Sequence, residues 1–240
     1  MAGPFGAGVT GNNFDITGGV SNLTVDLSEV LGAQDAETLN GDIFKGGVAF
    51  GGRHALNDPY SLVTVFGKYS AGAEYGTGEL ADNLRVNLLN LEAKAGVDTE
   101  FEIGRYSSLS VGASVIGQKQ NYNAPNFYDG SFTNADGNKT LLRNEGVLAG
   151  ADMSMNLGRF TFFGNYDFAI TENTNDRMGA GIALKFGKAC GNCDYGLNAL
   201  VKVSQSDVNG TDAVLGNNEV VNPVDKANAL NVSAGLSFKF

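Results

Sequence analysis

Several kinds of residue are scarce in this chain of 240 residues. It has no tryptophan, four prolines, two cysteines and one histidine, and charged residues make up only 18% of it. No run approaches the roughly 18 consecutive apolar residues that a membrane-spanning helix needs. The net charge of −10, without any basic stripe, argues against a nucleic-acid partner. These absences argue against both a helical membrane protein and a nucleic-acid-binding protein.

Glycine and aromatic residues are the abundant ones. The chain has 34 glycines, and a glycine inside a helix costs about 1 kcal/mol relative to alanine. It also has 15 phenylalanines and 8 tyrosines, which a disordered chain would have no means to bury. The composition therefore predicts a folded, all-β protein.

The last eleven residues alternate between two faces. One face holds Leu230, Val232, Ala234, Leu236, Phe238 and Phe240, and the other holds Asn231, Ser233, Gly235, Ser237 and Lys239. A tilted membrane strand needs about 9–11 residues, longer than the usual strand of a globular protein. The same alternation recurs in segments that begin near residues 63, 89, 109, 147, 160, 178 and 195, with weaker strands at 43–52 and within 5–20. We expect about ten strands in a single domain over residues 1–240.

The composition of the two faces indicates which one points outward. The second face is mostly Gly, Ser, Ala and Asn with isolated charges, which would cover a soluble barrel poorly but suits a crowded lumen. Aromatic residues lie towards the ends of several strands, as in the girdles of membrane barrels. The sequence predicts a transmembrane antiparallel up-and-down β-barrel whose apolar face contacts lipid.

The lengths of the links between strands alternate. Short links are expected near 53–60, 104–107, 157–158 and 190–193, and longer ones near 17–41, 76–86, 123–142 and 207–228, with an intermediate one at 171–176. In outer-membrane barrels the short turns are periplasmic and the long loops external, which places both termini in the periplasm. The short links carry the cations Arg53, Arg105, Arg159 and Lys188. The acidic long loops are either solvated or bind divalent cations shared with lipopolysaccharide phosphates.

The terminal Val-Ser-Ala-Gly-Leu-Ser-Phe-Lys-Phe resembles the closing strand of Gram-negative outer-membrane proteins. That resemblance implies that Leu236, Phe238 and Phe240 form the signal read by the barrel assembly machinery. The segment from Gly179 to Gly187 is similar in texture to autotransporter translocator strands, which implies a barrel of twelve strands around a helix. The resemblance covers strand texture from about residue 42 onward and implies a bacterial outer-membrane location, for a mature chain whose signal peptide has been removed.

Many charged residues fall on the face that should line the lumen. Buried ions must be paired or hydrated, because each otherwise costs several kcal/mol. The set is either a salt-bridge plug or the lining of a narrow water-filled path, and its acids on 89–103 would give such a path a weak cation preference. The residues are Lys45, Lys68, Glu74, Glu92, Lys94, Asp98, Glu100, Glu102, Asp152, Asp167, Arg177, Lys185, Lys202 and Lys239.

Cys190 and Cys193 flank a two-residue turn, where cysteines across a hairpin lie within disulfide range. In the oxidising periplasm we expect a disulfide, with a free dithiol as the alternative and redox activity less favoured. No second ligand pair for zinc is present. Residues 134–138 and 207–212 lack the glycine and glutamate of a calcium loop. We expect no metal and no cofactor.

His54, the only histidine, falls in a predicted periplasmic turn. Omptin-type proteases and lipid A deacylases resemble this architecture but use a histidine near the outer rim, so we expect no enzyme. The sequence favours a structural or surface-interaction scaffold with a largely plugged polar lumen, in contact with lipid, lipopolysaccharide and possible protein partners at its loops. The alternatives are a small porin and an autotransporter translocator. Residues 1–41 supply either the first strand and an external loop, or a short helix that includes Leu23, Leu27, Val30 and Leu31.

Overall fold

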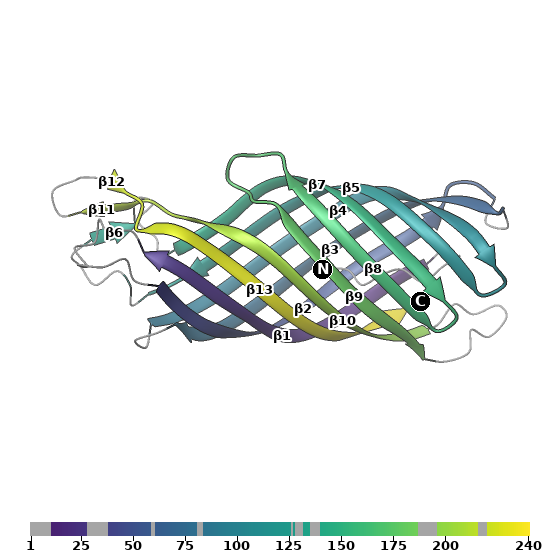
Figure 1. Ribbon diagram of the computed structural model, residues 1–240, viewed down its shortest axis with the longest axis horizontal. Helices are drawn as coiled ribbons and strands as arrows, with labels where there is room; N and C mark the ends of the chain where they lie inside the picture. Colours follow the sequence, from purple (N-terminus) through teal and green to yellow (C-terminus); the bar gives the residue numbers. More distant parts are fainter. Residues whose placement is uncertain are drawn as a thin grey trace.

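The chain forms a closed antiparallel barrel of ten strands, which confirms the expected fold class (Figure 1). In this computed structural model the described residues are 11–27, 38–58, 61–80, 84–125, 127, 132–134, 140–186, 196–215 and 220–240. None of them lies in a helix. The described part of the chain accordingly holds no apolar helix of membrane-spanning length.

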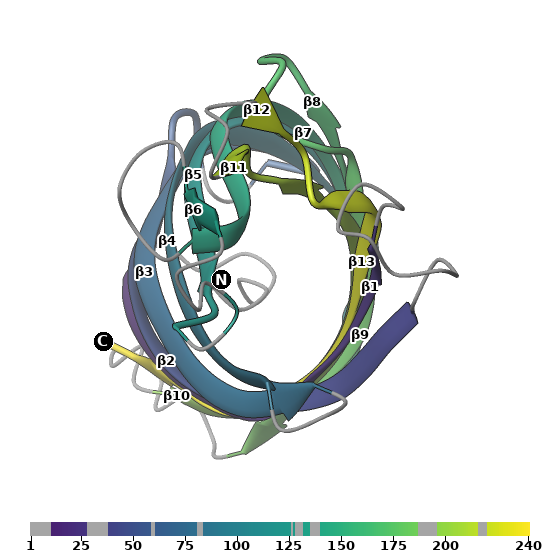
Figure 2. The ribbon, with the colours of Figure 1, turned by 90° about the vertical axis from the view of Figure 1, so that its left-hand side faces the viewer.

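Each barrel strand pairs with its neighbours in chain order, and β1 pairs with β13 to close the ring. The barrel strands are β1 (Gly11–Leu27), β2 (Thr38–Ala55), β3 (Val63–Leu80), β4 (Leu84–Gly104), β5 (Ser107–Asn123), β7 (Thr140–Leu157), β8 (Phe160–Ala169), β9 (Arg177–Phe186), β10 (Gly196–Gly210) and β13 (Val224–Lys239). A small separate sheet consists of β6 (Phe132–Asn134), β11 (Ala213–Leu215) and β12 (Val220–Val221). This sheet lies over one side of the rim (Figures 1 and 2).

The first residues of β1 and the last of β13 lie at one end of the barrel, here called the terminal end, and the opposite end is the loop end. Two predicted long links are shorter than expected, because β1 continues to Leu27 and because β3 and β4 run to within three residues of each other. The helix alternative is wrong for Leu23 and Leu27, which belong to β1; Val30 and Leu31 lie outside the described residues.

Large apolar side chains cover the outer surface. Phe44 is 66% exposed, Val115 58% and Phe168 51%, and similar residues follow the outward positions of every barrel strand. Monomeric soluble proteins do not expose so large and continuous an apolar surface to water. The outward direction predicted for the apolar face is therefore confirmed, and the barrel is of the membrane-spanning kind.

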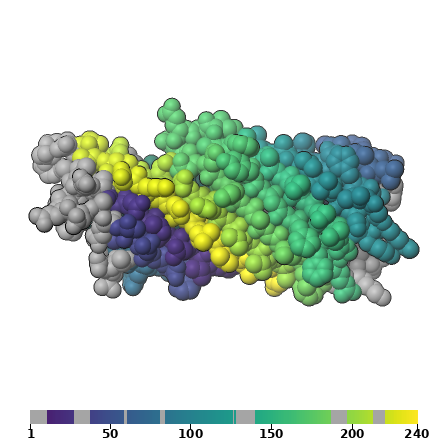
Figure 3. Space-filling view, in the orientation of Figure 1, coloured from purple at the N-terminus to yellow at the C-terminus, as the bar shows by residue number. Residues whose placement is uncertain are grey.

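The barrel does not keep ten strands along its whole length. β8 and β9 have ten residues each and stop before the loop end, where β7 pairs directly with β10. The tip of the β8–β9 hairpin rises from the outline of the barrel (Figure 3). The protein is thus a ten-stranded barrel that becomes eight-stranded towards the loop end.

The strand registers give the shear of both parts. A circuit of paired residues through all ten strands leaves β7 at Met155 and returns to it at Arg143, a shear of twelve. A circuit that omits β8 and β9 leaves β10 at Asn209 and returns at Val201, a shear of eight. A barrel of eight strands with shear eight is filled by its own side chains.

Candidate functional site

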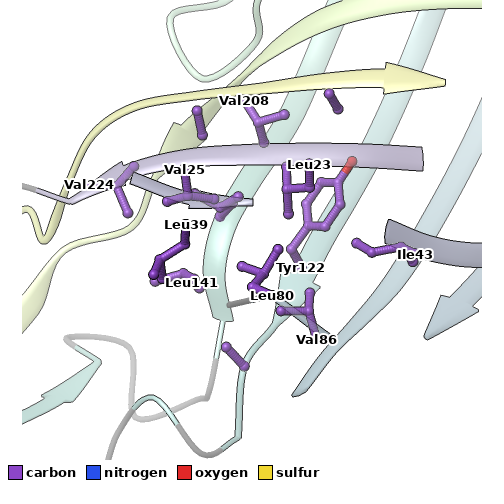
Figure 4. Close-up of a cluster of buried hydrophobic side chains, with 14 of the residues drawn as sticks. Leu23, Val25, Leu39, Ile43, Leu80, Val86, Tyr122, Leu141, Val208 and Val224 are labelled. Carbon is purple, nitrogen blue, oxygen red and sulfur yellow. The ribbon is translucent and has the colours of Figure 1, made fainter. Parts of the chain in front are cut away.

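The interior of the eight-stranded part, here called the loop-end section, is apolar. Its inward side chains pack against one another and are almost completely buried (Figure 4). The cluster comprises Leu23, Val25, Leu39, Ile43, Leu80, Val86, Leu88, Tyr122, Ala124, Leu141, Leu142, Val208, Val224, Ala227 and Ala229. One polar atom in it, the Tyr122 hydroxyl, accepts a hydrogen bond from Gln120 at 3.0 Å. The expectation of a polar lumen is therefore wrong for this section, whose interior is apolar.

The outer surface of the loop-end section is polar. Its outward residues include Asn22, Thr24, Asp26, Thr38, Asn40, Asp42, Thr77, Glu79, Arg85, Asn87, Lys119, Gln205, Asp207 and Lys226. Neighbouring strands exchange side-chain hydrogen bonds there, such as Thr24 to Asn40 at 2.7 Å. Apolar inside and polar outside is the arrangement of a soluble barrel, so this section stands in water or among headgroups.

The ten-stranded part, here called the membrane section, has the opposite arrangement. Its interior begins near the terminal end with Arg53, whose guanidinium binds both Asp98 and, at 2.8 Å, Glu100. The same guanidinium lies 3.5 Å from the centroid of the Phe66 ring. Arg53 had been assigned to a turn, but β2 continues to Ala55 and turns this side chain inward. The arginine ties β2 to β4 across the intervening β3.

A second cluster lies in the middle of the membrane section. Asp152 of β7 accepts from Lys68 of β3 at 2.6 Å and from Lys94 of β4 at 3.3 Å. The two lysines thus share one carboxylate, and the contact spans the lumen between strands that are not neighbours.

Arg177 of β9 forms a third cluster. It binds Glu92 of β4 at 2.7 Å and Asp167 of β8 at 2.6 Å, and it donates to Gln118 of β5 at 3.2 Å. Since β4 and β9 lie on opposite sides of the ring, this side chain crosses the lumen.

The remaining predicted lumen charges lie outside these three clusters. Lys45 binds Glu74 at 3.3 Å and donates to Asn231 at 2.7 Å. Lys185 and Lys202 also lie on inward positions, and neither forms an ion pair within the described part of the chain. Lys239 is inward near the terminal end, whereas Glu102 is exposed.

Two polar cavities lie among these clusters. The larger, of about 120 Å³, is bordered by the clusters of Arg53, Asp152 and Arg177. The smaller, of about 50 Å³, lies between Lys45, Gln118 and Ser206. Each exceeds the roughly 10–15 Å³ that one water requires. Both are bordered by Glu92, Arg177 and Lys202, so the Arg177 cluster separates them. Five cations and four carboxylates border the larger cavity, which gives no preference for cations.

The other predicted site residues have varied positions. Leu236, Phe238 and Phe240 point outward, and the Phe240 ring lies 6.3 Å from that of Phe50. His54 lies at the end of β2 on the outer surface, stacked on Tyr69 at 6.0 Å, and not in a turn. Cys190 and Cys193 lie outside the described residues, so their disulfide stays a prediction. Among the described residues, no three His, Cys, Asp or Glu form a group that could hold a metal.

Comparison with known protein families gave no match, and no curated protein matched the sequence. Solved structures of similar shape include the outer membrane protease OmpT of Escherichia coli (TM-score 0.45, 12% identity, 96% of this chain and 97% of that one). Others are the transport unit of the autotransporter AIDA-I of Escherichia coli (0.44, 11%, 96% and 90%) and the β domain of the Bordetella autotransporter BrkA (0.38, 12%, 97% and 100%). These likenesses are distant, and the barrel fold of this chain rests on its own strand order and apolar outer surface.

Proposed function

We propose that this protein is an integral barrel of a bacterial outer membrane that anchors and displays its loop-end section, and that it does not conduct along its axis. The observation that carries the proposal is the change from ten strands to eight. At the loop end the wall narrows to a shear of eight, and apolar side chains such as Leu23, Leu88 and Leu142 fill it. A barrel of that shape has no room for a pore.

The filling also argues against passage of ions. An ion entering the loop-end section would lose its hydration among leucine and valine side chains, and that desolvation costs several kcal/mol. Hydrophobic constrictions exclude water and close channels in the same way. The axial path is therefore blocked at the loop end, although the membrane section beneath it contains polar cavities.

In this proposal the ion pairs inside the membrane section hold the barrel strands together across the lumen. Arg53, Asp152 and Arg177 each bind two charged partners on other strands. Such pairs satisfy the charges that face the lumen and join strands across it. These ion pairs keep the wall of the membrane section rigid where it supports the loop-end section.

The partners follow from the two surfaces. Lipid contacts the apolar belt, and the headgroups of the outer leaflet, including lipopolysaccharide, contact the polar outer face of the loop-end section. The barrel assembly machinery would read Leu236, Phe238 and Phe240, and a protein partner would bind at the loops. We propose no catalytic role, since His54 lies on the outer surface beside Tyr69 rather than at the loop end.

A small porin is the second candidate, and the two polar cavities favour it. Recordings in planar bilayers separate the two. The scaffold predicts silence from inserted protein, with insertion verified by the heat-shifted mobility of the folded barrel. The variant Arg177→Met, which removes the bridge between the cavities, should also be silent, because the loop-end section still blocks the axis. Regular open steps from the unmodified protein would contradict the scaffold and support the porin.

A further inference from the structure

Among the described residues, the wall has one opening in its strand pairing, where ten strands become eight. Residues 144–147 of β7 have no strand beside them on the side of β8, and they face the 170–176 loop at the tip of the β8–β9 hairpin. We call this place the window. The strand pairs that border it are Leu148 with Ala169, Arg177 with Ser206, and Arg143 with Asn209.

Side chains supply most of the bonds that close the window. Two of the bonds join backbone groups, from Glu145 to Asn173 and from Ile170 to Val147, each of 2.9 Å. The others involve side chains. Asn175 donates to Asn209 at 2.9 Å and to Asn144 at 3.3 Å. Asn144 donates to the carbonyl of Asp207 at 2.9 Å and accepts from the Asn209 amide at 3.4 Å, and Thr171 accepts from the Val147 amide at 3.0 Å. Elsewhere the wall is a continuous ladder, such as the ten paired positions between β7 and β8. At the window, by contrast, only two backbone bonds are present, and side-chain bonds take the place of the ladder.

Gly146 allows the loop to lie in the window. Its φ is +157°, and a Cβ at this position would collide with the Thr171 hydroxyl. Thr171 in turn lies beside Thr174, whose hydroxyl donates to the Thr171 carbonyl at 2.8 Å. The loop therefore fits against bare backbone and not against a side chain of β7.

The smaller polar cavity lies on the inner side of the wall, next to the residues that border the window. Gln118 and Gln120, which border that cavity, pair with Gly146 and Asn144 across β5 and β7. Ser206, on its other side, is next to Asp207 at the edge of the window. The cavity thus borders residues that are strand partners or chain neighbours of those at the window.

We propose that the window is a side entrance through which water and small uncharged polar molecules reach the cavity behind it. The side chains that make the closing bonds are amides and hydroxyls, which bind such molecules by hydrogen bonds, while Glu145 on the outer surface is paired with Lys119. The cavity of about 50 Å³ limits the size of what enters. The inference places the external face at the loop end, as the proposed function does, but it holds whether or not the axis conducts.

The test is cysteine labelling of the purified full-length barrel in nanodiscs, with Cys190→Ser and Cys193→Ser in every variant. Ser204→Cys places a thiol in the cavity, and Ala227→Cys places one in the apolar loop-end interior. The reagent is iodoacetamide, which is small and uncharged. We expect Ser204→Cys to react and Ala227→Cys to stay unlabelled.

Variants of the loop identify the route. Asn175→Ala removes two closing bonds and should raise the labelling rate of Ser204→Cys about fivefold, as the loss of one or two hydrogen bonds gives. Asn173→Ala is the matched control, since it removes an exposed amide of the same loop and should leave the rate unchanged. Thr171→Val, which keeps the shape, should act like Asn175→Ala. Each variant is first checked for folding by its heat-shifted mobility.

Equal rates for Asn175→Ala and Asn173→Ala would overturn the window. An unreactive Ser204→Cys in every background would also overturn it. Labelling of Ala227→Cys at the same rate as Ser204→Cys would show that the reagent enters through the loop end, which contradicts both the window and the closed axis. A silent bilayer with an unreactive Ser204→Cys would leave the proposed function standing and remove only the window.

Discussion

The loop-end section and the membrane section are built from the same strands but place opposite residues inside. On β4, Val86 and Leu88 point inward while Asn87 points outward; a few residues further, Glu92 points inward and Leu91 outward. The strand direction and pairing do not change between these positions. The difference shows that the medium on each side of the wall, and not the β-strand itself, determines which face is apolar.

The inversion marks the edge of the hydrocarbon layer. A tilted strand needs about 9–11 residues to cross it, whereas β1 to β5 have 17 to 21 residues. The additional residues lie at the loop end and form the section with a soluble-type interior. The outer surface therefore changes from apolar to polar at the level where the inner surface changes from polar to apolar.

The largest effect should come from a carboxylate in the loop-end interior. Leu88→Asp removes a completely buried leucine and leaves an unpaired charge, so we expect a loss of more than about 4 kcal/mol in the free energy of unfolding. The neighbouring Leu89→Asp faces outward near the upper edge of the belt and should cost about 0–1 kcal/mol. Denaturant titration in lipid vesicles measures both. Equal losses would show that the inside of this section is not a packed core.

The next largest effect concerns the ion pairs of the membrane section. Arg177→Met leaves Glu92 and Asp167 without their shared cation and should cost about 3–5 kcal/mol. The triple variant that adds Glu92→Gln and Asp167→Asn should recover much of that loss, because neither position then carries an unpaired carboxylate. The same titration compares the variants. If the triple variant were as unstable as the single one, loss of packing and not loss of pairing would be the cause.

A charge on the outer surface tests where the two sections meet. Ala95 and Asn87 both point outward on β4, in the belt and in the loop-end section respectively. Ala95→Arg should cost about 2–4 kcal/mol, the value for a cation near the middle of the bilayer, whereas Asn87→Arg should be nearly neutral. A substantial cost for Asn87→Arg would place the hydrocarbon edge nearer the loop end than the inversion does.

The membrane section could be predicted from the sequence and the loop-end section could not. Period-two alternation with Leu236, Phe238 and Phe240 outward indicated the strands and the lipid-facing side. In the loop-end section the alternation persists, but its apolar members, such as Val86 and Leu88, are on the other face. Alternation alone does not show which face of a strand points into the barrel. The rule that apolar side chains point outward holds within the hydrocarbon layer and fails in the loop-end section outside it.

The sequence predicted which charged residues line the lumen, but it did not predict which of them form ion pairs. Inward parity was enough to bring Lys68, Lys94 and Asp152 to the lumen. Which of them meet depends on the shear of the barrel, and the shear follows from registers that no single strand encodes. Arg53 was missed because β2 extends further than its apolar residues, although its even spacing from Lys45 placed it on the same face. The change to eight strands had one signal, the short alternating runs of β8 and β9.

The smallest effect should come from the exposed ion pair of the loop-end section. Lys119 and Glu145 lie 3.2 Å apart on its outer surface, and both are close to half exposed. Water and salt screen such a pair, so Lys119→Ala should change the free energy of unfolding by no more than about 0.2–1 kcal/mol, and less in high salt. The Arg177 pairs should respond little to salt, since protein surrounds them. If Lys119→Ala cost as much as Arg177→Met, the outside of the loop-end section would not be in contact with water, and the contrast between the sections would fail there.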